Sequence, residues 1–344
     1  MRLPLVVLAA LARTAASYCC FYPETTRRCD NCQSIAEDSN YCAGSESKCV
    51  DECDHVWCDG AAADDGAAAA ATPVLPDGPE WQLGTYTTRY WDCCKPSCAW
   101  NGKGDVDRPV LACEAETGEI LTDANVAAVC DGGTAASCAS NQPWTYNDGV
   151  SLGFAAAAVS GNHGLNGDEN CGQCYELVWS NEGGAHPEIV GKSHIIQVTN
   201  IGYDVTGDHS FDLQIPGGGQ GIFDTGCVRQ FPGGLFGGYS TDDFDCGVRY
   251  GGCADESGCS RLPSELRAGC EWRFSDSYRS DNPYVRFRRV RCPAELVEIS
   301  GSTPRDDDDW PALDLDAYAG GGLYSRALGR RPGFALALFL GGLM

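Results

Sequence analysis

Asp92 is one of two aspartates in this 344-residue chain that stand in a rigid, aromatic-rich setting. It follows Trp91 and directly precedes Cys93 and Cys94. Two disulfides leading to different places would hold such a carboxylate nearly immobile, which suits a catalytic group. Flat aromatic rings beside it can stack on the faces of sugars. The segment therefore favours acid–base chemistry on a carbohydrate.

Asp212 is the second aspartate of this kind. It interrupts an apolar run in which Phe211, Leu213 and Ile215 alternate with it, and a glycine turn at residues 217–219 follows. Burial among apolar neighbours would favour the protonated form that a general acid requires. Glycosidic bonds are cleaved by one carboxylic acid and one carboxylate acting on opposite sides of the sugar. The two aspartates could supply that pair.

The elements that position these residues are expected to be mostly short strands. β-Branched and aromatic residues between Gly, Pro and Asn breaks predict strands over residues 175–179, 193–199 and 284–288. The Ala-rich stretch 150–159 predicts a helix, and residues 260–268 predict another, with Pro263 in its first turn and Gly269 as its stop. Many short strands with dense glycine favour a small β-barrel.

The composition indicates export. Twenty-two cysteines predict an oxidising compartment, because disulfides are rare in the cytosol. Residues 1–17 fit a signal peptide, with a basic start, a short apolar run and small residues before the cleavage site. The formal net charge of −24 repels phosphate backbones, so no nucleic-acid partner is expected. No run reaches the ~18 apolar residues of a membrane span. We expect a secreted, extracellular protein.

Three further segments flank a main domain over residues 81–302. Residues 18–60 hold eight cysteines, which predicts a small disulfide-rich module stapled by four bridges. Residues 61–80 are rich in Ala, Asp and Pro and predict an exposed linker. Residues 303–344 open with an acidic run and end in an apolar one. Two interpretations of this tail are open: a lipid-anchor signal that would attach the protein to a cell surface, and a disordered tail.

Two segments of the main domain contain the aspartates, residues 88–98 (TRYWDCCKPSC) and residues 211–219 (FDLQIPGGG) with 221–224 (GIFD). They closely resemble the signature and the second catalytic segment of glycoside hydrolase family 45 endoglucanases. Further matching stretches are NQPW at 141–144, LGFAA at 152–156, CYEL at 174–177, DNP at 281–283 and CPAELV at 292–297. The resemblance spans residues 84–300. It implies a mainly β fold, a six-stranded double-psi β-barrel with disulfide-stapled loops, a few short helices and a long open groove.

The resemblance also implies a reaction, the inverting hydrolysis of internal β-1,4-glucosidic bonds in cellulose or related glucans. Asp92 would be the general base that activates water, and Asp212 the general acid at the leaving oxygen. The carboxyls of an inverting pair lie ~6.5–9.5 Å apart. The implied partner is a β-1,4-glucan polysaccharide. No metal or organic cofactor is implied, and a monomer is expected.

Four further residues are implied to contact substrate: Thr88, Tyr90, Trp100 and Asp204. A structural role stays open for three of them, as core packing for Tyr90 and Trp100 and as strand filler for Thr88. Asp204 corresponds to a third family aspartate beside the acid. Its loop is one residue longer than the family spacing, so the roles of residues 204–210 stay open.

By position, the family's disulfides imply Cys93–Cys227, Cys94–Cys130, Cys98–Cys171, Cys113–Cys138, Cys174–Cys292 and Cys259–Cys270. A seventh family bridge has lost both partners together, because Gly172 and Ser302 occupy its positions. The two cysteines left over, Cys246 and Cys253, could then pair with each other.

Two alternatives remain beside the hydrolase. A non-hydrolytic, expansin-like protein that binds or loosens polysaccharide would share the barrel, but such proteins generally lack the base that Asp92 would supply. The N-terminal module, which contains Phe21, Tyr22, Tyr41 and Trp57, resembles the small appendages of polysaccharide-degrading enzymes. It could bind carbohydrate and raise the effective concentration of the enzyme at an insoluble surface. A protein-binding or purely structural role for it is also open.

Overall fold

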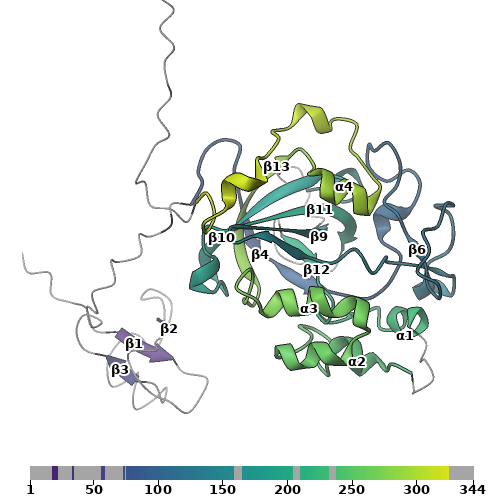
Figure 1. Ribbon diagram of the computed structural model, residues 1–344, viewed down its shortest axis with the longest axis horizontal. Coiled ribbons are helices and arrows are strands. Elements are labelled where there is room, and N and C mark those ends of the chain that lie inside the picture. The colour runs from purple at the N-terminus through teal and green to yellow at the C-terminus, as the bar shows by residue number, and fades with distance from the viewer. Residues whose placement is uncertain are drawn as a thin grey trace, which may run out of the picture. The chain divides into compact units, whose positions relative to one another are not determined.

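The computed structural model describes residues 73, 75–158, 165–203, 210–231 and 238–324, and three short strands nearer the N-terminus (Figure 1). The chain divides into two compact units, Met1–Ala70 and Ala71–Met344, and the division falls within the predicted linker. In the first unit, β1 (Tyr18–Phe21) pairs antiparallel with β2 (Gln33–Ser34) and β3 (Val56–Cys58). The signal segment and the side chains of the cysteine-rich module lie outside the described residues, so their roles remain predictions.

The second unit is mainly β, as predicted. Its strands are β4 (Gln82–Tyr86), β5 (Thr88–Tyr90), β6 (Cys113–Glu114), β7 (Ala135–Ala136), β8 (Trp144–Asn147), β9 (Val150–Ala158), β10 (Cys174–Gly183), β11 (Ser193–Gly202), β12 (Phe211–Gln214) and β13 (Pro283–Val290). Its α-helices are α1 (Gly226–Gln230), α2 (Thr241–Asp245), α3 (Arg267–Phe274) and α4 (Ala294–Ser300). Short 3-10 turns are η4 (Ser97–Ala99), η5 (Val129–Asp131), η6 (Asp168–Asn170), η7 (Pro187–Ile189), η8 (Glu256–Arg261), η9 (Ser264–Leu266), η10 (Asp307–Asp309) and η11 (Leu315–Tyr318).

The main sheet closes on itself. Its strands follow the order β4-β13-β10-β11-β9-β12-β5, with β8 paired to β9 outside this path. The first and last strands of the order, β4 and β5, are separated in the chain only by Thr87. The buried Thr87 fixes this bend, because its N–H and its hydroxyl both donate to the Pro283 carbonyl, at 2.9 and 3.0 Å. With β4 and β5 taken as one bent strand, the ring has six strands, the number predicted. The double-psi crossing itself stays a prediction.

The three predicted strands are confirmed within β10, β11 and β13, but the helix predicted over residues 150–159 is wrong. Alanine favours helices, yet this stretch forms β9, between β11 and β12. Every residue of β9 is buried, and Ala155 and Ala157 face a core that includes the large rings of Trp179 and Phe211. Small side chains fit there because their neighbours fill the space, so packing overrides the intrinsic helix preference.

The helix predicted over residues 260–268 begins and ends elsewhere. Pro263 caps η9 instead, and the α-helix α3 starts at Arg267 and runs through Gly269 to Phe274. Gly269 does not stop this helix. Its missing side chain allows close packing, since a Cβ at this position would lie 2.6 Å from Oε1 of Gln142 and 2.9 Å from Pro216.

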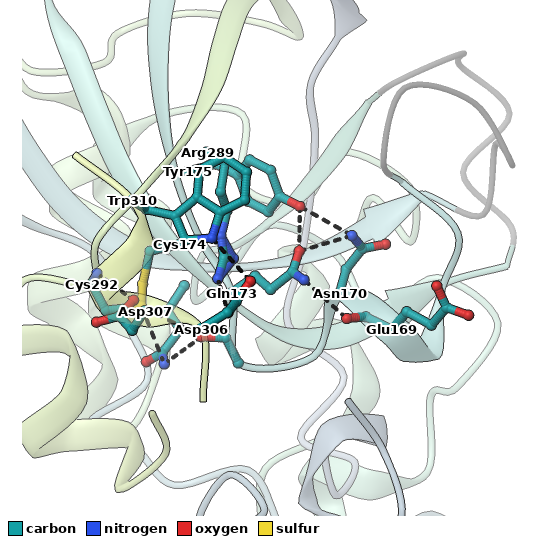
Figure 2. Close-up of polar contacts among 12 residues, drawn as sticks. Glu169, Asn170, Gln173, Cys174, Tyr175, Arg289, Cys292, Asp306, Asp307 and Trp310 are labelled. Carbon is teal, nitrogen blue, oxygen red and sulfur yellow. Dashed lines mark hydrogen bonds and ion pairs between the residues drawn. A yellow bond between two sulfur atoms is a disulfide. The ribbon is translucent and has the colours of Figure 1, made fainter. Parts of the chain in front are cut away.

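The folded unit continues past residue 302, where the sequence analysis ended the main domain. Figure 2 shows the acidic run of the predicted tail bound to the barrel: Asp306 pairs with Arg289 at 3.1 Å, and Asp307 accepts a bond from the Cys292 N–H at 3.0 Å. Trp310 donates to Asp306 at 3.0 Å, and the Arg289 guanidinium lies over its ring, 5.2 Å from the centroid. The acidic run is therefore part of the fold. Residues 325–344 lie outside the described part, so the two interpretations of the extreme C-terminus stay open.

A buried carboxylate completes this attachment. Glu176 on β10 is inaccessible to solvent, and it accepts hydrogen bonds from Tyr318 at 2.6 Å and from Ser193 at 2.9 Å. Arg288 neutralises its charge at 2.8 Å. Buried charges are tolerated when they are paired and hydrogen-bonded in this way. In the described part of the chain, no helix is long and apolar enough to cross a membrane.

Candidate active site

The disulfides of the described domain pair as the family resemblance implied. The bridges are Cys93–Cys227, Cys94–Cys130, Cys98–Cys171, Cys113–Cys138, Cys174–Cys292 and Cys259–Cys270, and the two remaining cysteines form Cys246–Cys253. Gly172 and Ser302, which replace the missing family bridge, still face each other: a Cβ on Gly172 would lie 3.3 Å from Oγ of Ser302. The side-chain amide of Gln197 joins the two positions instead, donating to both their carbonyls at 2.9 Å.

Asp92 is held by the turn that follows β5. Its Oδ1 accepts a hydrogen bond from the Cys94 N–H at 3.0 Å, and its residue is only 8% exposed. Cys93 adopts a left-handed backbone with φ of 62°, which its bridge to α1 helps to hold. Gly226 at the start of α1 allows this close packing, because a Cβ there would lie 2.5 Å from the Asp92 carbonyl oxygen. The two bridges predicted to immobilise Asp92 thus surround it.

Asp212 reaches the same region from β12. Its strand neighbours Phe211 and Leu213 are buried in the core, whereas Asp212 is partly exposed on the opposite face. This follows the alternation seen in the sequence. β12 lies between β9 and β5, and Asp212 is in register with Thr88 on the parallel strand β5. That pairing brings Asp212 beside the segment that leads into Asp92.

A cleft of about 520 Å³ collects these side chains. It is lined by Tyr86, Thr88, Arg89, Tyr90, Asp92, Ala156, Asn200, Ile201, Gly202, Asp212, Gln220, Gly221, Ile222, Phe223, Arg249, Tyr250, Gly251, Asp281 and Asn282. Both aspartates and the predicted contacts Thr88 and Tyr90 therefore share one cleft. Asp204 lies outside the described residues, so its role stays a prediction.

Trp100 does not line this cleft. It follows η4 and is half-buried, and the Lys95 ammonium lies over one face of its ring, 3.2 Å from the centroid. The same ammonium donates to the carbonyls of Ala124 and Val126 at 2.7 and 2.9 Å. Burial lowers the pKa of Lys95, although Asp123 opposes this shift. Only the face of Trp100 away from Lys95 can stack on a sugar.

The hydroxyl of Tyr90 is oriented by Asn200. A shift of register after Val198 marks a bulge in β11 next to Asn200. The Ser97 N–H can only donate, and it lies 2.9 Å from the side-chain oxygen of Asn200. This contact assigns the oxygen Oδ1 and the nitrogen Nδ2 of the Asn200 amide. Nδ2 of Asn200 therefore donates to the Tyr90 oxygen at 3.1 Å. The Tyr90 hydroxyl is therefore an acceptor for Asn200, and this bond fixes its position at the edge of the cleft.

Several cleft residues were missed by the sequence analysis. Ile222, Phe223 and Tyr250 are 53%, 52% and 66% exposed, which is unusual for large apolar side chains. Arg89 lies within residues 88–98, but the sequence did not indicate a role for it. It binds Asp281 at 2.6 Å and the Gly251 carbonyl at 2.9 Å. Aromatic residues next to glycines, as in Tyr250-Gly-Gly, were the available signal. No three potential metal ligands converge within the described part.

The family model for glycosyl hydrolase family 45 matches residues 84–303. The chain belongs to glycosyl hydrolase family 45. This family 45 protein is 45% identical over 214 residues to an endoglucanase of Cryptopygus antarcticus, covering 62% of this chain and 86% of the relative. It is 40% identical over 235 residues to a putative endoglucanase type K of Fusarium oxysporum, covering 68% of this chain and 57% of that one.

A solved structure is also similar to this family 45 protein. It is the crystal structure of a cellulase from the Antarctic springtail Cryptopygus antarcticus, with a TM-score of 0.54 and 42% identity. The match covers 65% of this chain and 99% of the springtail chain. The enzyme class predicted from the sequence, a glycoside hydrolase, is thereby confirmed. The N-terminal unit and the packed residues after 303 lie outside the matched family region.

Proposed function

We propose that this family 45 protein is a secreted endo-β-1,4-glucanase that hydrolyses internal bonds of cellulose or a related glucan with inversion. The observation that carries the proposal is the convergence of Asp92 and Asp212 in one cleft. They belong to the two separate segments that resemble the family's catalytic sequences. The names of the relatives, endoglucanases and a cellulase, support the same substrate class.

In the proposed mechanism, Asp212 is the general acid and Asp92 the general base. Asp212 protonates the glycosidic oxygen as the bond to the leaving sugar breaks. Asp92 removes a proton from a water that attacks the anomeric carbon from the opposite face, which inverts its configuration. The Cys94 N–H holds one oxygen of the Asp92 carboxylate and fixes its orientation.

Groups around the pair would hold the glucan. Tyr90 lines the cleft with its hydroxyl held by Asn200, and its ring and hydroxyl offer contacts to a sugar. The exposed rings of Phe223 and Tyr250 offer flat apolar surfaces for sugar faces. Location outside the cell is supported by the seven bridges of the described domain, which persist only under oxidising conditions.

The test is proton NMR of fresh products from a soluble β-1,4-glucan oligomer, with Asp92→Asn and Asp212→Asn variants. New α-anomeric ends from the wild type would establish inversion. Each variant should lose roughly 10²- to 10⁴-fold in kcat, the usual contribution of a general acid or base. Asparagine at 92 keeps an oxygen acceptor for the Cys94 N–H, so the turn should be retained.

An exposed carboxylate outside the cleft provides the matched control. Asp105 is 84% exposed and pairs with Arg305, so Asp105→Asn should keep wild-type kcat. New β-anomeric ends would contradict inversion. A folded wild type that binds glucan oligomers without cleaving them would overturn the hydrolase proposal and favour an expansin-like binder.

A further inference from the structure

One wall of the cleft is built from two segments that carry large exposed apolar side chains. Residues 221–224 carry Ile222 and Phe223, and the loop 246–253 carries Tyr250. Each of these three side chains is more than half exposed, so packing into the core does not hold it in place. Their positions must therefore be set by the backbone that bears them.

Arg249 binds residues 221–224 through both its side chain and its main chain. Nη1 pairs with the Asp224 carboxylate at 3.0 Å, Nη2 donates to the Ile222 carbonyl at 3.2 Å, and Nε donates to the Gly221 carbonyl. In the opposite direction, the Gly221 N–H donates to the Arg249 carbonyl at 3.2 Å. The fixed fork of a guanidinium suits such a multiple contact, which the single ammonium of lysine cannot reproduce.

The loop that carries Arg249 is itself fixed at its base. The Cys246–Cys253 bridge, which is additional to the family bridges carried over by position, closes it. The Cys253 N–H donates to the Gly217 carbonyl at 2.8 Å, and Arg89 donates to the Gly251 carbonyl at 2.9 Å. Because this loop is fixed, the bonds from Arg249 also fix the position of residues 221–224.

We propose that Arg249 is a positioning residue for glucan binding. It holds the Phe223 segment and the Tyr250 loop as one rigid wall, so that their rings meet the sugar units without reordering. This inference rests on the proposed function, because the occupant of the wall is the β-1,4-glucan chain that leads to the two aspartates. Preorganised side chains bind more tightly because less conformational freedom is lost on binding.

The test compares Arg249→Met with Arg261→Met. Arg261 also forms a surface ion pair, with Asp243 at 3.2 Å, and the side-chain exposures of the two pairs are similar, 42%/25% against 45%/35%. Arg261 does not line the cleft. For Arg249→Met we expect KM for a soluble glucan oligomer to rise about five- to tenfold with kcat within about twofold. Arg261→Met should leave both constants unchanged.

Binding provides a readout that does not depend on turnover. In an Asp212→Asn background, calorimetric titration with the same oligomer should show the same five- to tenfold loss of affinity on Arg249→Met. Arg249→Lys, which keeps a charge opposite Asp224, should recover only part of it. An unchanged KM and affinity in Arg249→Met, even with lowered thermal stability, would overturn the inference.

Failure of the proposed function would be seen in a different measurement, the cleavage of the oligomer by the wild type. A wild type that binds the oligomer but does not cleave it would refute the hydrolase, while the calorimetric comparison would still decide the role of Arg249. A wild type that neither binds nor cleaves any β-1,4-glucan oligomer would overturn both.

Discussion

Replacing His194 should remove an acid-sensitive contribution to the stability of the barrel. His194 on β11 is fully buried, stacked on Trp179 with ring centroids 5.9 Å apart and tilted against Trp272 at 5.0 Å. Tyr278 packs on both tryptophans, so aromatic rings form much of the surroundings of His194. Burial lowers the pKa of His194 to about 3, and the backbone of Ser151 opposes this shift.

The sign and size of the effect follow from proton linkage. A histidine in the unfolded chain titrates near ~6.5. Below that pH the unfolded state takes up a proton, whereas folded His194 stays neutral until the pH approaches about 3. The stability contribution is therefore complete above pH ~6.5 and is lost as the pH falls, by about 1.4 kcal/mol per unit. Between pH ~6.5 and ~5 the loss is about 2 kcal/mol.

Urea unfolding at pH 7.5 and 5.0, with the disulfides intact, measures this loss. His194→Phe keeps an aromatic ring in the stack but cannot take up a proton, so its free energy of unfolding should fall about 2 kcal/mol less than that of the wild type. His186→Asn, at a partly exposed histidine, is the control and should follow the wild type. If His194→Phe shows the wild-type pH dependence, the acid sensitivity does not come from burial of this neutral imidazole, and the reasoning is refuted.

Three other outcomes are expected. Tyr90→Phe should lower kcat/KM for a soluble glucan oligomer about five- to tenfold, and a change in unfolding free energy alone would contradict a role in substrate binding. Tyr318→Phe removes a hydrogen bond to a buried carboxylate and should cost about 1.5–3 kcal/mol in urea unfolding; a cost near zero would show that the bond does not hold the C-terminal segment. Gly172→Cys with Ser302→Cys should restore the missing bridge if Val106→Ala makes room, because Val106 lies 2.5 Å from the new Cβ. The new bridge closes an effective loop of about 15 residues, worth at most about 3 kcal/mol, and the left-handed backbone at 172 costs about 1–2 kcal/mol. The melting temperature of the oxidised protein should therefore rise by a few degrees relative to Val106→Ala alone, and no rise would refute the estimate.

Sequence reasoning succeeded where the signal is local or where whole segments resemble a family. The setting of Asp92, between Trp91 and two cysteines, is a property of adjacent residues and could be read directly. The alternation around Asp212 predicted a strand with one buried face, and β12 has that form. Seven disulfides followed from the resemblance and the even number of remaining cysteines, because the bridges of a stapled fold depend on its topology.

Local signals failed where a distant neighbour decides the outcome. Residues 150–159 carry the alanines of a helix, but their position between β11 and β12 makes them a strand. The acidic run after residue 302 has the composition of a solvated tail, yet Arg289 and Cys292 bind it to the barrel. Arg249 has no local signature either, since its partners lie some 25 residues away in the chain.

Composition and contiguous motifs were therefore enough to predict export, to indicate the family and to single out the two candidate aspartates, because such information is local to the chain. How these parts meet depends on the fold. It closed the sheet at Thr87, placed Asp212 in register with Thr88 beside the Asp92 turn, left Trp100 outside the cleft, and joined Arg249 to the Phe223 segment. Strand pairing and buried hydrogen bonds join residues far apart in the chain, and no periodicity or motif records which partner each residue will find.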